Sequence, residues 1–87
     1  MARKTVLVAS AVGLHARPAA LIAQAAGQYD EILLSLQGSD EDSVDAASSL
    51  MIMTLGAAKG AAVTVESENA EAVEQIAALI ERDLDAE

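Results

Sequence analysis

The only histidine of the chain, His15, lies in a segment that could accept a phosphoryl group. It directly precedes a predicted helix over residues 16–26, with Arg17 and Pro18 in the first turn. Helix N-termini expose about four N–H groups without intrahelical partners and a partial positive charge, so they bind phosphate readily. Pro18 is suited to the helix start and leaves nearby amides, such as that of Ala16, free to bind phosphate oxygens. Arg17 adds a permanent charge and planar donors, so the segment predicts phosphoryl transfer through His15.

Positive charge around His15 also disfavours the imidazolium form, because like charges repel. A neutral imidazole keeps the lone pair that attacks phosphorus, and the amides and Arg17 would then compensate the charge of the bound phosphate. A lone histidine near a helix start is more often a surface or capping residue, so the segment alone leaves both interpretations open.

A metal site is disfavoured, since the sequence has no second histidine and no cysteine. The cluster from Asp40 to Asp42 lacks the twelve-residue calcium-loop pattern and is predicted to be a solvated turn.

The composition favours a small domain that docks on other proteins. The 87 residues allow one domain, over residues 1–87, with no disulfide to hold it. A net charge of −9 makes nucleic acid and anionic lipid poor partners. A domain of this size has little depth for a cleft of roughly 300–1,000 Å³, and no general-base dyad or nucleotide loop is present, so we expect neither an enzyme nor a cofactor. No apolar run approaches the ~20 residues of a membrane span, and no signal peptide is seen, so we expect a cytoplasmic monomer without membrane insertion.

The hydrophobic pattern predicts four strands, over residues 4–10, 31–36, 43–46 and 60–67. It also predicts helices over residues 16–26 and 47–55, ended by Gly27 and Gly56, and a last helix capped by Asn69. The residues expected to face the core are Val6, Val8, Ile32, Leu34, Leu36, Val63 and Val65 on the strands, and Val73, Ile76, Ala77, Ile80 and Leu84 on the last helix. The order β-α-β-β-α-β-α, with one apolar face on each strand, implies a two-layer α+β domain.

The second predicted helix carries more apolar residues than its length can bury. Ile52 and Leu55 are expected to serve the core. Leu50, Met51 and Met53 cannot all point inward from one short helix, so part of this apolar surface should be exposed. Exposed Met and Leu side chains near a reactive site commonly mark a docking surface.

The segment Leu14-His15-Ala16-Arg17-Pro18-Ala19 resembles the active-site signature of the HPr family, the histidine phosphocarriers of the bacterial sugar phosphotransferase system. Residues 48–56, followed by Lys59-Gly60, resemble the family's regulatory-serine helix and the turn after it, and the similarity covers essentially the whole chain. This resemblance implies an open-faced β-sandwich, with three helices on one side of a four-stranded antiparallel sheet. It also implies that His15 accepts phosphate on Nδ1 from Enzyme I and passes it to the IIA domains of sugar permeases.

The resemblance implies two roles for the second helix. In the family this helix contacts Enzyme I and the IIA domains, and Leu50 and Met53 hold matching positions. Together with Leu14 they are expected to form the docking surface. Ser48 aligns with a serine that an ATP-dependent kinase phosphorylates in some relatives, although a role as N-cap of a helix beginning near Ser49 is the simpler interpretation.

Several residues depart from the family pattern. Ala47 stands where relatives often have lysine, and Met51 where they often have glycine or a polar residue. Ser49 replaces a large apolar residue and makes the phosphosite ambiguous by one position. Only Arg17 and Lys59 could supply positive charge near the site. A paralogue serving a nitrogen-related or regulatory branch, and an interaction domain that is never phosphorylated, therefore stay open as alternatives.

Overall fold

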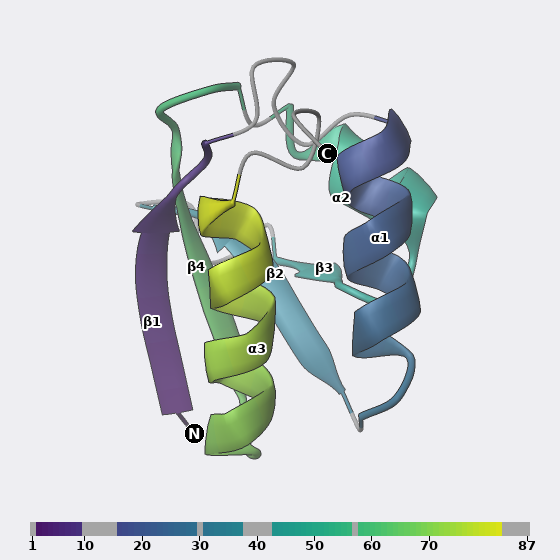
Figure 1. Cartoon of the computed structure of the whole chain (residues 1–87), viewed down its shortest axis with the longest axis vertical. Helices are drawn as coiled ribbons and strands as arrows, with labels where there is room; N and C mark the ends of the chain where they lie inside the picture. The colour runs from purple at the N-terminus through teal and green to yellow at the C-terminus, as the bar shows by residue number, and fades with distance from the viewer. Residues whose placement is uncertain (1, 10–15, 30, 38–42, 57, 83–87) are drawn as a thin grey trace.

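In the part of the chain that the structure describes, four strands and three helices pack in two layers (Figure 1). The computed structural model describes residues 2–9, 16–29, 31–37, 43–56 and 58–82. The elements follow in the order β1 (Ala2–Leu7), α1 (Ala16–Ala26), β2 (Ile32–Leu36), β3 (Val44–Asp45), α2 (Ser49–Thr54), β4 (Ala62–Ser67) and α3 (Ala70–Glu81). The strands form one sheet in the order β1-β4-β2-β3, and each neighbouring pair is antiparallel. The predicted α+β class and element order are therefore confirmed.

The strand register places the apolar strand residues on one face of the sheet. Val6 lies opposite Val63, and Leu34 lies opposite Val65, in the two central pairings. Because strand side chains alternate between faces, these residues form a continuous apolar surface that the helices cover. The helices contribute four fully buried isoleucines to the same core, Ile22, Ile52, Ile76 and Ile80. Every predicted core residue within the described ranges is buried, except that Leu36 and Leu55 are half-buried against the core.

The opposite face of the sheet carries the small polar Thr5 and Thr64 together with larger side chains such as Leu33 and Glu66, and none of the described helices covers it (Figure 1). Thr5 and Thr64 lie opposite each other in the register, with their hydroxyl oxygens 2.8 Å apart. Leu7, at the end of β1, is 61% exposed. This exposed leucine lies on an element that the sequence did not associate with docking.

Strand β1 lies two or three residues nearer the N-terminus than predicted. It adds Ala2 and Arg3 at its start, because an edge strand tolerates a charged residue. The Nζ atom of Lys4 lies 3.2 Å from Oε1 of Glu74 on α3. The strand ends at Leu7 instead of residue 10, and β4 begins at Ala62 instead of residue 60. Both shifts have one cause, a turn around Gly60 that ends the regular pairing of β1 with β4.

Local signals explain the limits of α1 and α2. Helix α1 matches its predicted range, with Pro18 in the first turn and Gly27 directly after the last residue. Helix α2 is shorter than predicted, because Ser48 caps it and the residues before Ser48 form a turn. Gly56, which follows α2, has a φ of 65° and is the predicted left-handed glycine.

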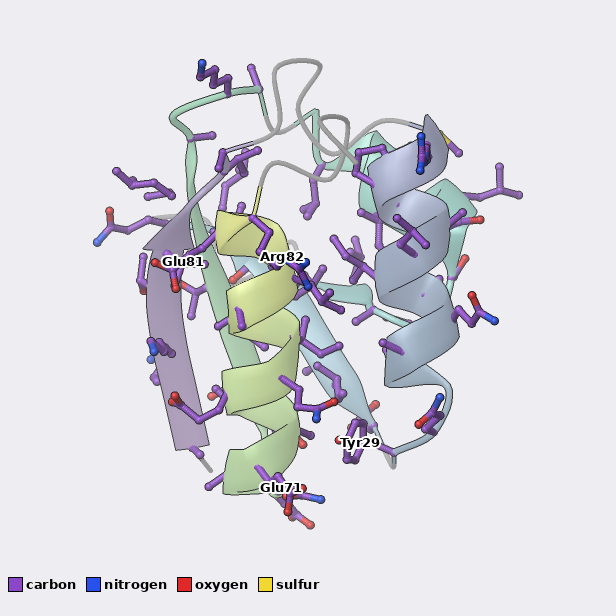
Figure 2. All side chains as sticks on the ribbon, viewed as in Figure 1. Tyr29, Glu71, Glu81 and Arg82 are labelled. Atoms are coloured by element: carbon purple, nitrogen blue, oxygen red, sulfur yellow. The ribbon has the colours of Figure 1, made fainter. Side chains whose placement is uncertain are left out.

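Asn69 caps α3 as predicted, with its Oδ1 accepting from the amides of Glu71 at 3.0 Å and Ala72 at 3.3 Å. The helix ends at Glu81, since Arg82 has an extended backbone. Figure 2 shows Glu71 and Arg82 at opposite ends of α3. The prediction that Leu84 continues the apolar stripe falls outside the described residues. None of the helices in the described ranges is both long and apolar enough to cross a membrane.

Candidate functional site

The first turn of α1 places Arg17 and Pro18 on different sides of the helix. Pro18 is fully buried, whereas Arg17 is exposed. Helix α1 begins at Ala16, so the amide of Ala16 belongs to the first turn, where amides lack intrahelical partners. His15 directly precedes this turn in the sequence, but His15 and Leu14 lie outside the described residues. The described part of the site therefore consists of the helix start, its amides and the Arg17 side chain.

The buried proline fixes where these amides lie. Pro18 and the fully buried Ala19 anchor the first turn of α1 in the molecule. Proline has a preset φ and no N–H, so it starts the helix at little entropic cost and loses no hydrogen bond there. Helix α1 has eleven residues, and its first turn contains no acidic residue. No side chain of that turn therefore compensates the partial positive charge at the N-terminus of the helix. Such a helix start is suited to an anionic group held by residues directly before it.

Ser48 is the N-cap of α2, as the sequence predicted. Its backbone is extended, and its Oγ accepts a hydrogen bond from the amide of Met51 at 3.3 Å. Its side chain is half-buried, as is that of Ser49, the first residue of the helix. The capping role is thus confirmed, while phosphorylation of either serine stays a prediction.

Helix α2 exposes part of its apolar surface. Leu50 is 72% exposed and Met51 is 44% exposed. Ile52 is fully buried, while Met53 and Leu55 are half-buried against the core. The prediction that this helix cannot bury all its apolar residues is confirmed. The exposed part consists of Leu50 and Met51, with Met53 reaching the surface only partly.

Helices α1 and α2 pack against each other, and α2 lies beside the upper turns of α1 in Figure 1. The upper end of α1 in that view is its N-terminus, where Arg17 lies. The exposed apolar residues of α2 are therefore on an element next to the one that carries Arg17.

Two predicted features remain, Lys59 and the acidic cluster. Lys59 is exposed in the turn before β4. The Asp40–Asp42 cluster lies outside the described residues. Among the residues that the structure does describe, no group of three His, Cys, Asp or Glu side chains could hold a metal ion.

Sequence reasoning missed the hydrogen bonds around Val8 and Ala9, the last described residues before the histidine segment. The amide of Gly60 donates to the carbonyl of Val8 at 2.8 Å, and the amide of Ala9 donates to the carbonyl of Ile80 at 3.3 Å. The glycine after Lys59 was a possible signal for the first of these bonds. The second joins residues far apart in the sequence, so no local pattern indicates it.

Comparisons with known proteins agree with this geometry. A family model described as the PTS HPr component phosphorylation site matches residues 2–82. The phosphocarrier protein HPr from Bacillus anthracis str. Ames is 35% identical, with a TM-score of 0.78 over 91% of this chain and 95% of that one. HPr-C-His from Thermoanaerobacter tengcongensis is 34% identical, with a TM-score of 0.79 over 93% and 92%. A mycoplasma histidine-containing phosphocarrier protein, 24% identical, shares the fold with a TM-score of 0.71 over 91% of this chain and 86% of that one. This chain therefore belongs to the HPr family of phosphocarriers of the sugar phosphotransferase system.

Proposed function

We propose that this chain accepts a phosphoryl group from phospho-Enzyme I on Nδ1 of His15 and passes it to the IIA domains of sugar permeases. The observation that carries the proposal is the position of His15, one residue before a helix whose first turn presents Arg17 to solvent. The family match over residues 2–82 includes this segment. The chain acts here as a cytoplasmic, monomeric carrier with a transient phosphohistidine, not as an independent enzyme.

The chemistry is a pair of phosphoryl transfers through one nitrogen. In the first, the Nδ1 lone pair forms a bond to phosphorus while the bond from phosphorus to its donor group on Enzyme I breaks. In the second, a nucleophile of the IIA domain takes the phosphoryl group and returns the lone pair to Nδ1. The amides at the start of α1 and the Arg17 guanidinium stabilise the negative charge of the phosphoryl group during both steps.

Docking brings the two reacting groups together. The exposed Leu50 and the half-buried Met53, together with Leu14 of the histidine segment, provide the apolar contacts with Enzyme I and the IIA domains. Because α2 packs beside α1, a partner bound at α2 holds its reacting group near the start of α1. Phosphorylation of Ser48 or Ser49 would add a dianion at the edge of this surface and oppose docking.

Incubation with phosphoenolpyruvate and Enzyme I, followed by intact mass measurement under non-acidic conditions, tests the proposal. We expect one acid-labile phosphoryl group per chain. His15 is the only histidine, so His15→Ala should abolish labelling while the domain still folds. Undiminished labelling of this variant would exclude His15 as the acceptor. A wild-type chain that folds but takes up no phosphate would instead favour an interaction domain that is never phosphorylated.

A further inference from the structure

The backbone of Val8 and Ala9 is held on two sides, directly before the segment that carries His15. On the β4 side, the amide of Val8 donates to the carbonyl of Ala61 at 3.0 Å, and its carbonyl accepts from the amide of Gly60 at 2.8 Å. On the other side, the amide of Ala9 donates to the carbonyl of Ile80 in the last turn of α3, at 3.3 Å. The Val8 side chain is also buried in the core. Figure 1 shows the C-terminal ends of β1 and α3 on the same side of the molecule.

The contacts of Val8 form a β-bulge. Two residues of the β4 side, Gly60 and Ala61, bond to the single residue Val8. The φ of Gly60 is 88°, and the amide of Ala61 donates to the carbonyl of Ala58 at 2.9 Å. This combination is that of a type II turn, whose third residue takes a φ of about +80° and is usually glycine. Bulges of this kind end regular pairing and are frequent beside functional sites, where they redirect the chain.

The bulge acts at the point where β1 leaves the sheet. Regular pairing with β4 ends at Leu7 and Ala62, and by Ala9 the backbone bonds to α3 instead of β4. The bulge therefore determines where the chain turns from the sheet towards the helix layer. Six residues then lead from Ala9 to α1, and His15 is the last of them.

We propose that Gly60 is a positioning residue for phosphoryl transfer: its bulge, with the last turn of α3, fixes the chain where it enters the His15 segment. The kinetic part of this inference rests on the proposed function, since it assumes that His15 is the acceptor. Transfer needs the imidazole nitrogen in line with the incoming phosphorus. A displacement of about 1 Å at a reacting group can lower a rate by about 100-fold.

Gly56 provides a matched control for Gly60. Both have positive φ, 65° and 88°, and a Cβ added at either position meets nothing within 4 Å. An alanine at either position is therefore strained by its backbone and not by a clash. Of the two glycines, Gly60 bonds to Val8, whereas the amide of Gly56 bonds to Met53 in the preceding helix α2. The two substitutions should lower the melting temperature by similar amounts.

The test combines an NMR measurement with kinetics on the full chain. The ring-proton shifts of His15, the only imidazole, are recorded at about pH 8.5, where an ordinary imidazole is neutral. Gly60→Ala should move these signals and lower kcat for transfer from Enzyme I by about tenfold, with little change in KM. Gly56→Ala should leave the ring signals in place. Gly60→Asn should lie between wild type and Gly60→Ala, because asparagine tolerates positive φ better.

The two proposals fail in different ways. If Gly60→Ala and Gly56→Ala lower stability equally, and the two variants also have the same ring signals and the same kcat, Gly60 has only a structural role and the inference is wrong. If the wild-type chain takes up no phosphate, the proposed function fails, while the ring signals still decide whether Gly60 positions His15. If Gly60→Ala does not fold, the same comparison is made between Gly60→Asn and Gly56→Asn.

Discussion

At the start of α1, the neighbouring residues Arg17 and Pro18 have different surroundings and different roles. Pro18 is buried and fixes the helix start, so it acts through the backbone. Arg17 is exposed and brings a charge that no other residue of the first turn supplies. Its guanidinium can face a phosphoryl group through two parallel donors, which a lysine at this position would not reproduce.

Arg17→Ala is therefore expected to lower the rate of transfer more than docking. Loss of one donor to a developing charge can lower kcat by up to about 100-fold, whereas KM for Enzyme I should change little. Steady-state kinetics with Enzyme I measure both constants. Arg3→Ala is the control, because it removes the same charge near the start of β1, and Figure 1 shows the start of β1 and the start of α1 at opposite ends of the molecule. Equal effects of the two substitutions would show that Arg17 acts only through net charge.

Ser48 allows capping and regulation to be separated. Ser48→Ala removes the acceptor of the Met51 amide and should lower the free energy of unfolding by about 1 kcal/mol. Ser48→Asp keeps an acceptor at the helix start and should be nearly neutral for stability. Denaturant unfolding measures both, with Ser49→Ala as a control that leaves the cap in place.

If the same position also controls docking, Ser48→Asp should slow phosphoryl receipt from Enzyme I by adding charge beside Leu50. Ser49→Asp tests the neighbouring serine in the same assay. Transfer rates equal to wild type for both aspartate variants would leave Ser48 with the capping role alone.

At the scale of the helix, α2 carries both buried residues that stabilise the fold and exposed residues that are available for docking. Ile52 is fully buried, so its loss would destabilise the domain. Leu50 is largely exposed, so its removal costs the folded chain little. A buried apolar anchor at an interface is commonly worth about 1–3 kcal/mol, so Leu50→Ala should raise KM for Enzyme I by roughly 5- to 160-fold.

Leu7 provides a control that tests whether docking depends on α2. It is 61% exposed on β1, so Leu7→Ala removes a similarly exposed leucine elsewhere and should leave KM unchanged. Met53→Ala should also raise KM, together with a loss of stability, because Met53 is half-buried against the core. Kinetics and thermal unfolding of the three variants distinguish these effects. A rise in KM for Leu7→Ala equal to that for Leu50→Ala would contradict docking on α2.

The elements that local chemistry specifies were predicted well. Helix α1 has its predicted limits because Pro18 and Gly27 mark its two ends. The caps Ser48 and Asn69 were also found, since a side-chain oxygen before an apolar run is a local signal. The end of β1 was predicted wrongly because it depends on the bulge at Gly60, more than fifty residues away. Half-burial of Met53 likewise depends on how α2 packs on the core, which periodicity in a six-residue helix does not determine.

At the scale of the whole molecule, the negative net charge opposes docking on an acidic partner. The chain has 14 acidic and 5 basic residues, so its net field repels an acidic partner. Two of the basic residues, Arg3 and Lys4, lie on β1, and Lys4 pairs with Glu74. Arg17 and Lys59 are the charges that could attract a partner near the site, and both are exposed. Apolar contact at α2 is therefore the stronger candidate for the source of affinity.

This balance predicts a weak dependence of docking on salt. Between about 0.01 M and 0.15 M ionic strength the Debye length falls from about 30 Å to about 8 Å, so long-range steering is largely lost while apolar contacts persist. KM for Enzyme I should rise by less than about threefold over this range, because screening weakens the attraction of Arg17 and Lys59 but also the repulsion from the remaining acidic surface. Steady-state kinetics at the two ionic strengths measure the change, with Lys59→Ala as a variant that should reduce it further. A steep rise in KM with salt, together with unchanged KM for Leu50→Ala and Met53→Ala, would show that Arg17 and Lys59 govern the encounter despite the net charge.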